Sequence, residues 1–179
     1  WDFDDVRDHY LHEYYGVDPA QLRYAEPERY LHLSRLVSGR MMADAMEEWR
    51  RGRSLCHGAL IWFLRDLWPG AGWGVIDSRG EPKAAWYALA RSLQPVAVFF
   101  SDEGLNGLAI HVVNESANEL NVSLELSLFR TMESTARKAK LELRLNAREA
   151  REIPCTDLLE GFLDVTHAYR FGPQPFSLA

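Results

Sequence analysis

Side chains that could bind a sugar gather between residues 58 and 83 of this 179-residue sequence. Trp62 and Trp73 are large apolar groups in and beside a glycine-rich stretch, and an indole is costly to leave in water. The C–H face of a sugar ring would cover it, because that face stacks on an indole. Arg65 and Asp66 lie between the two tryptophans, and their side chains can hydrogen-bond hydroxyl groups. We therefore take Trp62, Arg65, Asp66 and Trp73 as the candidate substrate-binding residues.

Each of these residues also has a structural interpretation. Trp62 fits a packed core, and Trp73, like Trp68, fits a plug that fills the loop. Asp66 fits a salt bridge or a turn cap, since aspartate is rarely buried without a partner. Arg65 can then pair with Asp66 or with an acid elsewhere. The residue types alone leave both interpretations open.

The elements around these residues predict an α/β unit. The uninterrupted apolar run Ala59–Leu64 is typical of a strand buried on both faces, as in parallel sheets. A long helix is predicted from Pro27 to about Gly52, because proline favours the first turn and glycine can end a helix. A second helix is predicted from Pro82 to about Leu93, and a short one from Asp4 to Tyr15. Helix, strand, loop and helix in this order make one α/β repeat.

After Pro95 the apolar period changes to two, which predicts short antiparallel strands. They cover 96–100, 108–112, 122–128 and 141–145, with a further strand at 164–171 and a break at Pro173 and Pro175. Turn signals separate these strands at spacings of about 8–12 residues, which favours a β-sandwich. We count about six strands where an immunoglobulin-like sandwich has about seven. The predicted domain boundary is at Gln94–Pro95.

The composition narrows the class of partner. Hydrophobic residues make up 47% and charged residues 26%, which is an ordinary globular balance, and the net charge is -6. This charge argues against nucleic acid or an anionic membrane as a partner. Cys56 and Cys155 have no metal-ligand spacing, and the six histidines are scattered. We expect neither a metal site nor a cofactor.

A motif runs through the tryptophan-rich region: Trp62-Phe-Leu-Arg-Asp66-Leu-Trp68-Pro69, then Gly72-Trp73-Gly-Val-Ile-Asp77, then Gly80 and Lys83-Ala-Ala-Trp-Tyr87. It resembles the last barrel strand and following helix of glycoside hydrolase family 2, in the β-mannosidase branch. The match covers about residues 56–93, and the sequence departs from it at Arg65, where the family usually has asparagine. A guanidinium cannot simply repeat an asparagine contact, so this departure affects sugar specificity.

The resemblance implies an architecture. Residues 1–94 would be the C-terminal portion of a (β/α)8 TIM barrel, with helix seven, strand eight and helix eight. Residues 95–179 would be the immunoglobulin-like antiparallel β-sandwich that follows it, lacking or shortening its last strand. The sequence begins with Trp1 and has no initiator methionine, so we expect a C-terminal fragment of a longer enzyme.

The resemblance also implies a function. The parent would be a retaining exo-glycosidase acting on terminal β-D-mannosides, which needs two carboxylates about 5–5.5 Å apart. Both catalytic Glu would precede Trp1, so we expect no catalytic residue in this chain and no activity from it alone. Trp62 would form the floor of the subsite for the cleaved sugar. The expected partners are a β-mannoside or related oligosaccharide, the remainder of the barrel and, for the isolated fragment, a second copy.

Two features qualify this interpretation. The dipeptides Asn114-Glu115 and Asn118-Glu119 resemble the family's acid/base dipeptide, but they fall in a predicted turn, where asparagine is common without catalysis. The rival hypothesis is a non-catalytic carbohydrate-binding or interaction module with an aromatic platform. The strand Ala59–Leu64 discriminates the two, because a barrel requires such a strand and a stand-alone module does not.

Overall fold

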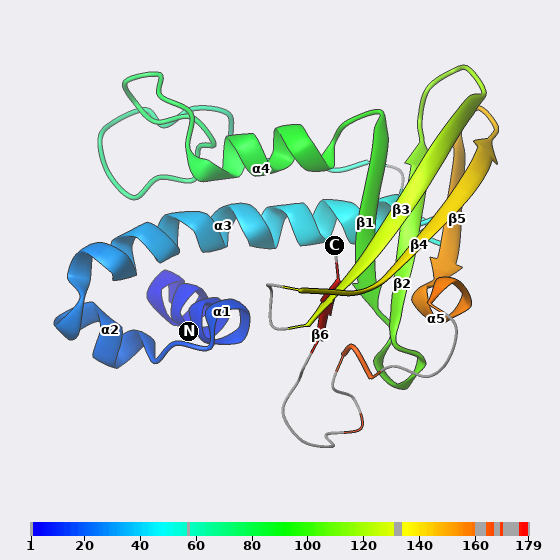
Figure 1. The fold of residues 1–179 in the computed structure, drawn as a ribbon. Helices are drawn as coiled ribbons and strands as arrows, with labels where there is room; N and C mark the ends of the chain where they lie inside the picture. Colours follow the sequence, from blue (N-terminus) through cyan, green and yellow to red (C-terminus); the bar gives the residue numbers. More distant parts are fainter. Residues whose placement is uncertain are drawn as a thin grey trace. The chain divides into compact units, whose positions relative to one another are not determined.

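The chain forms two compact units. The computed structural model describes residues 2–56, 58–130, 134–159, 164–166 and 169, and the backbone of 176–178. One unit holds Trp1–Trp49 and Cys56–Gln94, and the other holds Arg50–Leu55 and Pro95–Ala179. Helices dominate the first unit and antiparallel strands the second (Figure 1). The mixture of helices and antiparallel strands predicted from the sequence is therefore confirmed.

The helices that precede the sheets are α1 (Phe3–Tyr15), α2 (Pro19–Ala25), α3 (Pro27–Arg50) and α4 (Ala84–Ser92). Two of these, α1 and α2, begin after aspartates that accept hydrogen bonds from free backbone amides. The Asp2 carboxylate accepts hydrogen bonds from the amides of Asp4 and Asp5, and Asp18 caps α2 in the same way. Helix α2 was not predicted from the sequence. Pro19 is the first residue of that helix rather than a break, since proline suits the first turn.

Small and apolar side chains hold the helices of the first unit together. Leu11, Leu22, Tyr30 and Val37 form one buried cluster. Gly39 of α3 lies against α4, where an added Cβ would be 3.1 Å from both the Ala84 carbonyl oxygen and the Ala88 Cβ. A larger residue would therefore push these two helices apart.

The predicted strand Ala59–Leu64 is wrong for this structure. These residues have no strand conformation, the Leu60 side chain is fully exposed, and Trp62 is 77% exposed. A strand needs a neighbour for its backbone N–H and C=O groups. Among the described residues, the first unit contains no named strand that could be this neighbour.

The second unit contains two three-stranded antiparallel sheets. Its strands are β1 (Val96–Asp102), β2 (Leu108–Asn114), β3 (Leu120–Arg130), β4 (Ser134–Leu145), β5 (Glu149–Pro154) and β6 (Phe176–Leu178). The strand orders are β1-β2-β5 and β4-β3-β6. A short 3₁₀ helix, η1 (Gly104–Asn106), joins β1 to β2, and α5 (Cys155–Leu158) follows β5.

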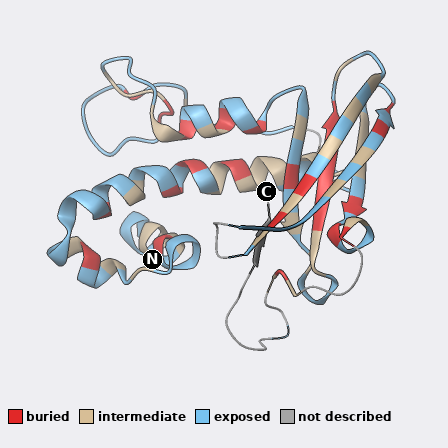
Figure 2. Ribbon diagram, viewed as in Figure 1, coloured by how far each residue is buried: buried red, intermediate tan, exposed pale blue. Residues whose placement is uncertain are grey.

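Both sheets contribute to one apolar core. Ile110 and Ile153 come from the first sheet, and Leu126, Leu128 and Leu145 come from the second. Buried and exposed residues alternate along much of β3 and β4, as one-sided burial requires (Figure 2). The apolar residues that alternate along the sequence thus form this core.

Two strands differ from those predicted. Strand β5 was missed, because half of the residues in Glu149–Pro154 are charged and Ile153 is its one large apolar residue. In the predicted strand 164–171, residues 164–166 form a turn, and most of the rest lies outside the described residues. Strand β6 instead follows Pro175, where we predicted that the chain is broken.

Candidate functional site

Residues 58–83, here called the tryptophan loop, fold back on themselves through a few backbone hydrogen bonds. Two isolated bridges join Arg65 to Ile76 and Ile76 to Pro82. The Asp66 amide donates to the Ile76 carbonyl at 3.0 Å, and the Ile76 amide donates to the Leu64 carbonyl at 2.9 Å. The loop therefore has a defined backbone conformation although it lacks a helix or a named strand.

The Asp66 carboxylate lies at the centre of this loop. Its side chain is buried, and the residue as a whole is 4% exposed. One oxygen, Oδ1, accepts a hydrogen bond from the Gly74 amide at 2.7 Å, and Oδ2 forms an ion pair with Lys83 Nζ. Lys83 Nζ also donates to the Gly72 carbonyl at 3.0 Å. The bond from Lys83, with the Gly74 amide, holds the pKa of Asp66 below its usual value despite burial.

Two glycines make room for this carboxylate. A Cβ at Gly72 would lie 2.2 Å from Asp66 Oδ1, and one at Gly74 would lie 2.5 Å from the Asp66 amide nitrogen. Carbon atoms do not approach oxygen or nitrogen this closely without a bond, so any side chain at either position would displace Asp66 or the loop. The glycine spacing thus follows from the position of one carboxylate.

Arg65 is directed to a different partner from the one considered at first. Its Nη2 donates to the carbonyl of Ser78 at 2.7 Å, while Asp66 pairs with Lys83. Asp77 closes the neighbouring turn, since its Oδ1 accepts from the amides of Arg79 and Glu81. Lys83 is not among the candidate residues taken from the sequence. The glycines beside Trp73 were the signal that a buried group approaches there.

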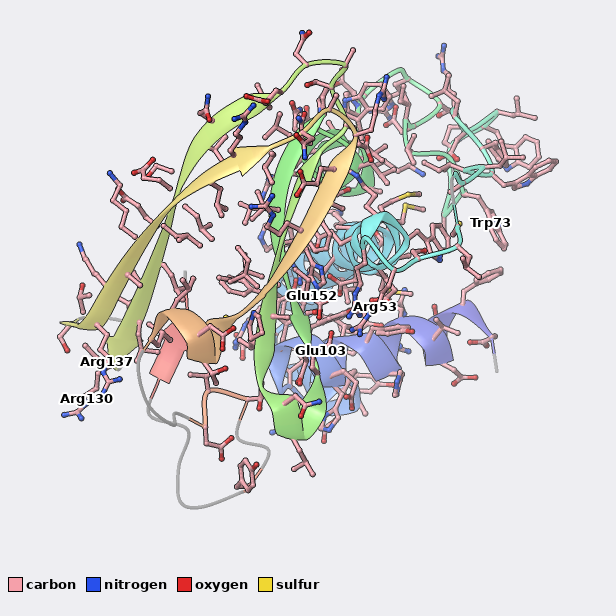
Figure 3. The ribbon with its side chains drawn as sticks, turned by 90° about the vertical axis from the view of Figure 1, so that its right-hand side faces the viewer. Arg53, Trp73, Glu103, Arg130, Arg137 and Glu152 are labelled. Atoms are coloured by element: carbon pink, nitrogen blue, oxygen red, sulfur yellow. The ribbon has the colours of Figure 1, made fainter. Side chains whose placement is uncertain are left out.

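The two candidate tryptophans lie at the surface of the described structure. Trp62 is 77% exposed. Its ring packs edge-on against that of Phe63, with 6.0 Å between the ring centroids, and a cis peptide bond joins the two residues. Trp73 is 56% exposed and packs edge-on against Phe3 of α1 at 4.8 Å. Figure 3 labels Trp73 on the tryptophan loop. The structure therefore buries Asp66 inside the loop, leaves Arg65 exposed with a bond to the Ser78 carbonyl, and leaves both indoles accessible.

The two Asn-Glu dipeptides have structural roles. Asn114 is fully buried at the end of β2, where its side-chain nitrogen donates to the carbonyls of Asn118 and Asn146 at 2.8 Å. Glu115 pairs with Arg50 at 2.9 Å, and Glu119 pairs with Arg144 at 2.6 Å. Both glutamates thus neutralise arginines at a turn, in agreement with the structural interpretation of these dipeptides.

A polar cluster on the first sheet resembles a catalytic site but is satisfied internally. Ser101 Oγ lies 2.7 Å from His111 Nε2 and donates to Glu103 at 2.7 Å. A carboxylate only accepts, so Glu103 competes with His111 for the single hydroxyl proton of Ser101. Glu103 also forms ion pairs with Arg51 and Arg53.

The surroundings of His111 confirm that this cluster is closed to substrate. His111 is 1% exposed and stacks on Phe99, and its pKa is lowered by burial and by the charge of Arg51. The carboxylate oxygen Oε2 of Glu152 lies 3.9 Å from Nδ1 of His111. The same oxygen lies 3.8 Å from Nε of Arg53. Arg53, Glu103 and Glu152 converge on one place in Figure 3. A buried group with these partners stabilises the sheet unit rather than reacting.

No group of three or more His, Cys, Asp or Glu side chains in the described part of the chain is arranged to hold a metal ion. Within the same residues, no helix has both the length and the apolar character that crossing a membrane requires.

Comparisons with known proteins place the chain in a family. No family model matches it. The β-mannosidase B of Aspergillus oryzae is 30% identical over 165 residues, which are 85% of this chain and 19% of that protein. The β-mannosidase B of Aspergillus niger is 42% identical over 74 residues, which are 40% of this chain and 9% of that protein. The chain belongs to glycoside hydrolase family 2. The resemblance to the C-terminal part of these enzymes, in the β-mannosidase branch, is confirmed.

Solved structures of this family share the fold. A β-D-mannosidase from Dictyoglomus thermophilum superposes with a TM-score of 0.65 at 21% identity, over 70% of this chain and 15% of that one. An exo-chitosanase from Amycolatopsis orientalis gives a TM-score of 0.65 at 15% identity, over 87% of this chain and 18% of that one. The family 2 chain described here thus spans about a fifth, or less, of the length of the proteins that it matches.

Proposed function

We propose that this chain is the C-terminal part of a retaining exo-glycosidase that hydrolyses terminal β-D-mannosides. In this proposal the two catalytic Glu lie on a part of the enzyme outside these 179 residues, so the chain alone has no turnover. Residues 1–94 complete a TIM barrel, and residues 95–179 form the immunoglobulin-like domain beside it. The chain contributes an aromatic sugar-binding loop to the complete active site.

The observation that carries this proposal is the pair of exposed indoles on an internally bonded loop. Trp62 and Trp73 present accessible aromatic surface, and sugar rings stack on such surfaces. The chain that holds them is similar over 85% of its length to a protein named β-mannosidase B. We assign Trp62 and Trp73 to contact with the sugar. Asp66 supports the loop from the inside, and Arg65 supports it at the surface through its bond to the Ser78 carbonyl.

The exposed apolar stretch supports the proposal that further chain covers this region. Leu60 is fully exposed, and Ile61 and Leu64 line an apolar groove with α4. The groove has a volume of about 280 Å³, and its other lining residues are Val75, Trp86, Leu89, Ala90 and Leu93. Soluble proteins rarely leave contiguous apolar surface of this kind uncovered. Neighbouring barrel strands would pair with residues 59–64 and bury these side chains.

The first experiment compares this chain with a longer form that includes the residues encoded before Trp1. Both are assayed on p-nitrophenyl β-D-mannoside, β-D-galactoside and β-D-glucosaminide. We expect the longer form to release p-nitrophenol mainly from the mannoside, and the chain alone to release none. The upstream sequence is expected to encode two Glu on barrel strands roughly a hundred residues apart, because βα units must separate those strands. Turnover by the chain alone, or preference for another sugar, would contradict the proposal.

A second experiment tests Trp62 in the longer form. We expect Trp62→Ala to lower kcat/KM for the β-mannoside roughly tenfold, because an aromatic contact is worth about 0.5–1.5 kcal/mol beyond its buried area. The matched control is Tyr24→Ala, which removes an exposed aromatic side chain from α2. Equal effects of the two substitutions would remove Trp62 from the proposed site.

Light scattering tests whether the apolar stretch is uncovered in solution. We expect the isolated chain to form dimers or larger species at tens of micromolar, and we expect the longer form to be free of this association. A monomeric isolated chain would contradict the proposed exposure. Binding of mannose-containing oligosaccharides without hydrolysis by either form would favour the rival function, a non-catalytic carbohydrate-binding module.

A further inference from the structure

The position of Asp66 raises a question about its role. A carboxylate next to exposed tryptophans in a glycosidase sequence is an obvious candidate for contact with a sugar hydroxyl. Contact of that kind needs an oxygen that the substrate can reach. Asp66 is 4% exposed, so its oxygens are closed to a ligand of sugar size.

Both oxygens of Asp66 are already engaged within the tryptophan loop. Oδ1 accepts from the Gly74 amide at 2.7 Å, and Oδ2 meets Lys83 Nζ. Lys83 in turn donates to the Gly72 carbonyl at 3.0 Å. The carboxylate and Lys83 thus tie together Asp66 and three residues that follow it by 6, 8 and 17 positions, Gly72, Gly74 and Lys83, and Trp73 lies between the two glycines.

Backbone bonds of Ile76 with Leu64 and Asp66 close the base of the loop tip, and Trp73 packs edge-on against Phe3. Leu67, Trp68 and Trp73 are all more than half exposed, so they gain little from apolar packing. The Lys83 amide does bond to the Val75 carbonyl at 2.9 Å, but this bond lies after the tip. Above that base, the side-chain bonds inside the tip centre on a charged pair, with glycines at 72 and 74 because no side chain fits beside it.

We propose that Asp66 is a positioning residue: with Lys83 and the Gly74 amide it closes the tryptophan loop and so fixes the indole of Trp73, without touching the substrate. This role rests on the proposed function only for its effect on hydrolysis. Closure of the loop itself is a property of the chain without any ligand. The two parts can therefore be measured separately.

The test uses Asp66→Asn, Lys83→Met and the double variant. Asparagine keeps an acceptor for Gly74 but turns an amide N–H group toward the lysine. Methionine leaves a buried carboxylate without its cation, which is the more disruptive change. The double variant has neither charge, so its defect is expected to be smaller than the sum of the two single defects. Lys83→Arg keeps the positive charge, so it is expected to retain most of the loop closure that Lys83→Met loses.

Hydrogen exchange over residues 66–83 is measured first, on this chain without ligand. We expect exchange at the Gly74 amide to be at least roughly tenfold faster in both single variants, as a charge-assisted bond is lost or weakened. The matched control is Lys140→Met, which removes the cation of an exposed pair with Glu142 on β4. That control is expected to leave exchange in residues 66–83 unchanged.

Hydrolysis is then measured in the longer form with p-nitrophenyl β-D-mannoside. A positioning role predicts that Asp66→Asn and Lys83→Met lower kcat/KM by similar factors, that the double variant is no worse, and that Lys83→Arg restores activity. A loss confined to Asp66→Asn, with exchange unchanged, would show direct substrate contact and overturn the proposal. If the longer form has no activity, the proposed function fails while the exchange result still decides loop closure.

Discussion

The tryptophan loop and the sheet unit both contain apolar segments, but they hold and cover these segments in different ways. The strands of the sheet unit pair with one another, and leucines and isoleucines from both sheets bury each other. The tryptophan loop has apolar side chains of similar size, but Leu60 and Trp62 are exposed, and a buried ion pair holds the loop together. The comparison teaches that an apolar sequence becomes a strand only where a partner supplies hydrogen bonds and cover.

The largest expected effect contrasts a leucine from each region. Leu128→Ala in β3 removes a side chain that is 1% exposed, and it should lower the free energy of unfolding by about 2–5 kcal/mol. Leu60→Ala removes a fully exposed one and should change it by no more than about 0.5 kcal/mol. Urea denaturation followed by circular dichroism measures both.

The same leucine sharpens the comparison in the proposed longer form. If barrel strands cover residues 59–64 there, Leu60→Ala should cost about 2–5 kcal/mol, as in a core. An unchanged stability of the longer form would mean that Leu60 stays exposed, and the proposed strand pairing would then be wrong.

The contrast explains which parts of the fold could be predicted from the sequence. Strands such as β2 and β3 were predicted from their alternating apolar residues. The prediction holds because residues such as Val112 and Leu126 are buried against partners within the chain. The helix α3 was predicted because residues at its own ends mark it: Pro27 suits the first turn, and Gly52 can end the helix. The run 59–64 has the same apolar signal, but that signal does not say whether a partner is present. Strand β5 has the opposite difficulty, since its pairing with β2 comes from backbone bonds that leave little mark on Glu149–Pro154.

For the candidate site, the segment could be proposed from the sequence, but the bonds within it could not. Asp66 had two interpretations, and only coordinates give the bonds to Gly74 and Lys83. Arg65 pairs with the Ser78 carbonyl, which no spacing rule indicates. Long side chains reach partners that lie far along the chain, so their choice depends on the folded loop rather than on neighbouring residues.

The second prediction concerns a polar group buried in the sheet unit. Asn114→Ala removes two donors to the carbonyls of Asn118 and Asn146 and the acceptor for the Ser116 amide. Backbone groups left without partners make the loss about 1–3 kcal/mol in the free energy of unfolding. Asn121→Ala on the exposed side of β3 is the control and should be nearly neutral. A small loss at Asn114 would mean that water replaces its amide.

The third prediction is a pH dependence of the sheet unit. Burial and Arg51 hold the pKa of His111 below its usual value, against the opposing charges of Glu152 and Glu103. The unfolded chain then binds a proton more readily than the folded one, so stability is present above about pH 6.5 and falls as the pH drops through the lower folded pKa.

Urea denaturation between pH 7.5 and 5 tests this dependence. His111→Gln should flatten the slope in this range, while His32→Gln, an exposed residue of α3, should leave it unchanged. The tryptophan loop responds at lower pH, because the pKa of Asp66 is also depressed but starts from the range of a carboxyl group. Its ion pair should persist through this window and be lost only below about pH 4. Parallel slopes for His111→Gln and the unchanged chain would assign the acid sensitivity to other groups.

The smallest expected effect comes from an exposed ion pair in the sheet unit, which serves as a comparison for the pair of Asp66 with Lys83. Arg144 of β4 pairs with Glu119 at 2.6 Å, with side chains that are 72% and 40% exposed, whereas Asp66 and Lys83 pair inside the tryptophan loop. Water and salt screen the first pair, so Arg144→Met should shift the denaturation midpoint by no more than the error of the measurement. Lys83→Met should open the loop under the same conditions, because it leaves the Asp66 charge buried without its cation. Raising the salt concentration to 1 M should remove any remaining effect at Arg144 and preserve the effect at Lys83. Equal salt sensitivity at both sites would mean that solvent reaches Asp66, and the contrast between a loop closed by charge and sheets held by apolar packing would no longer hold.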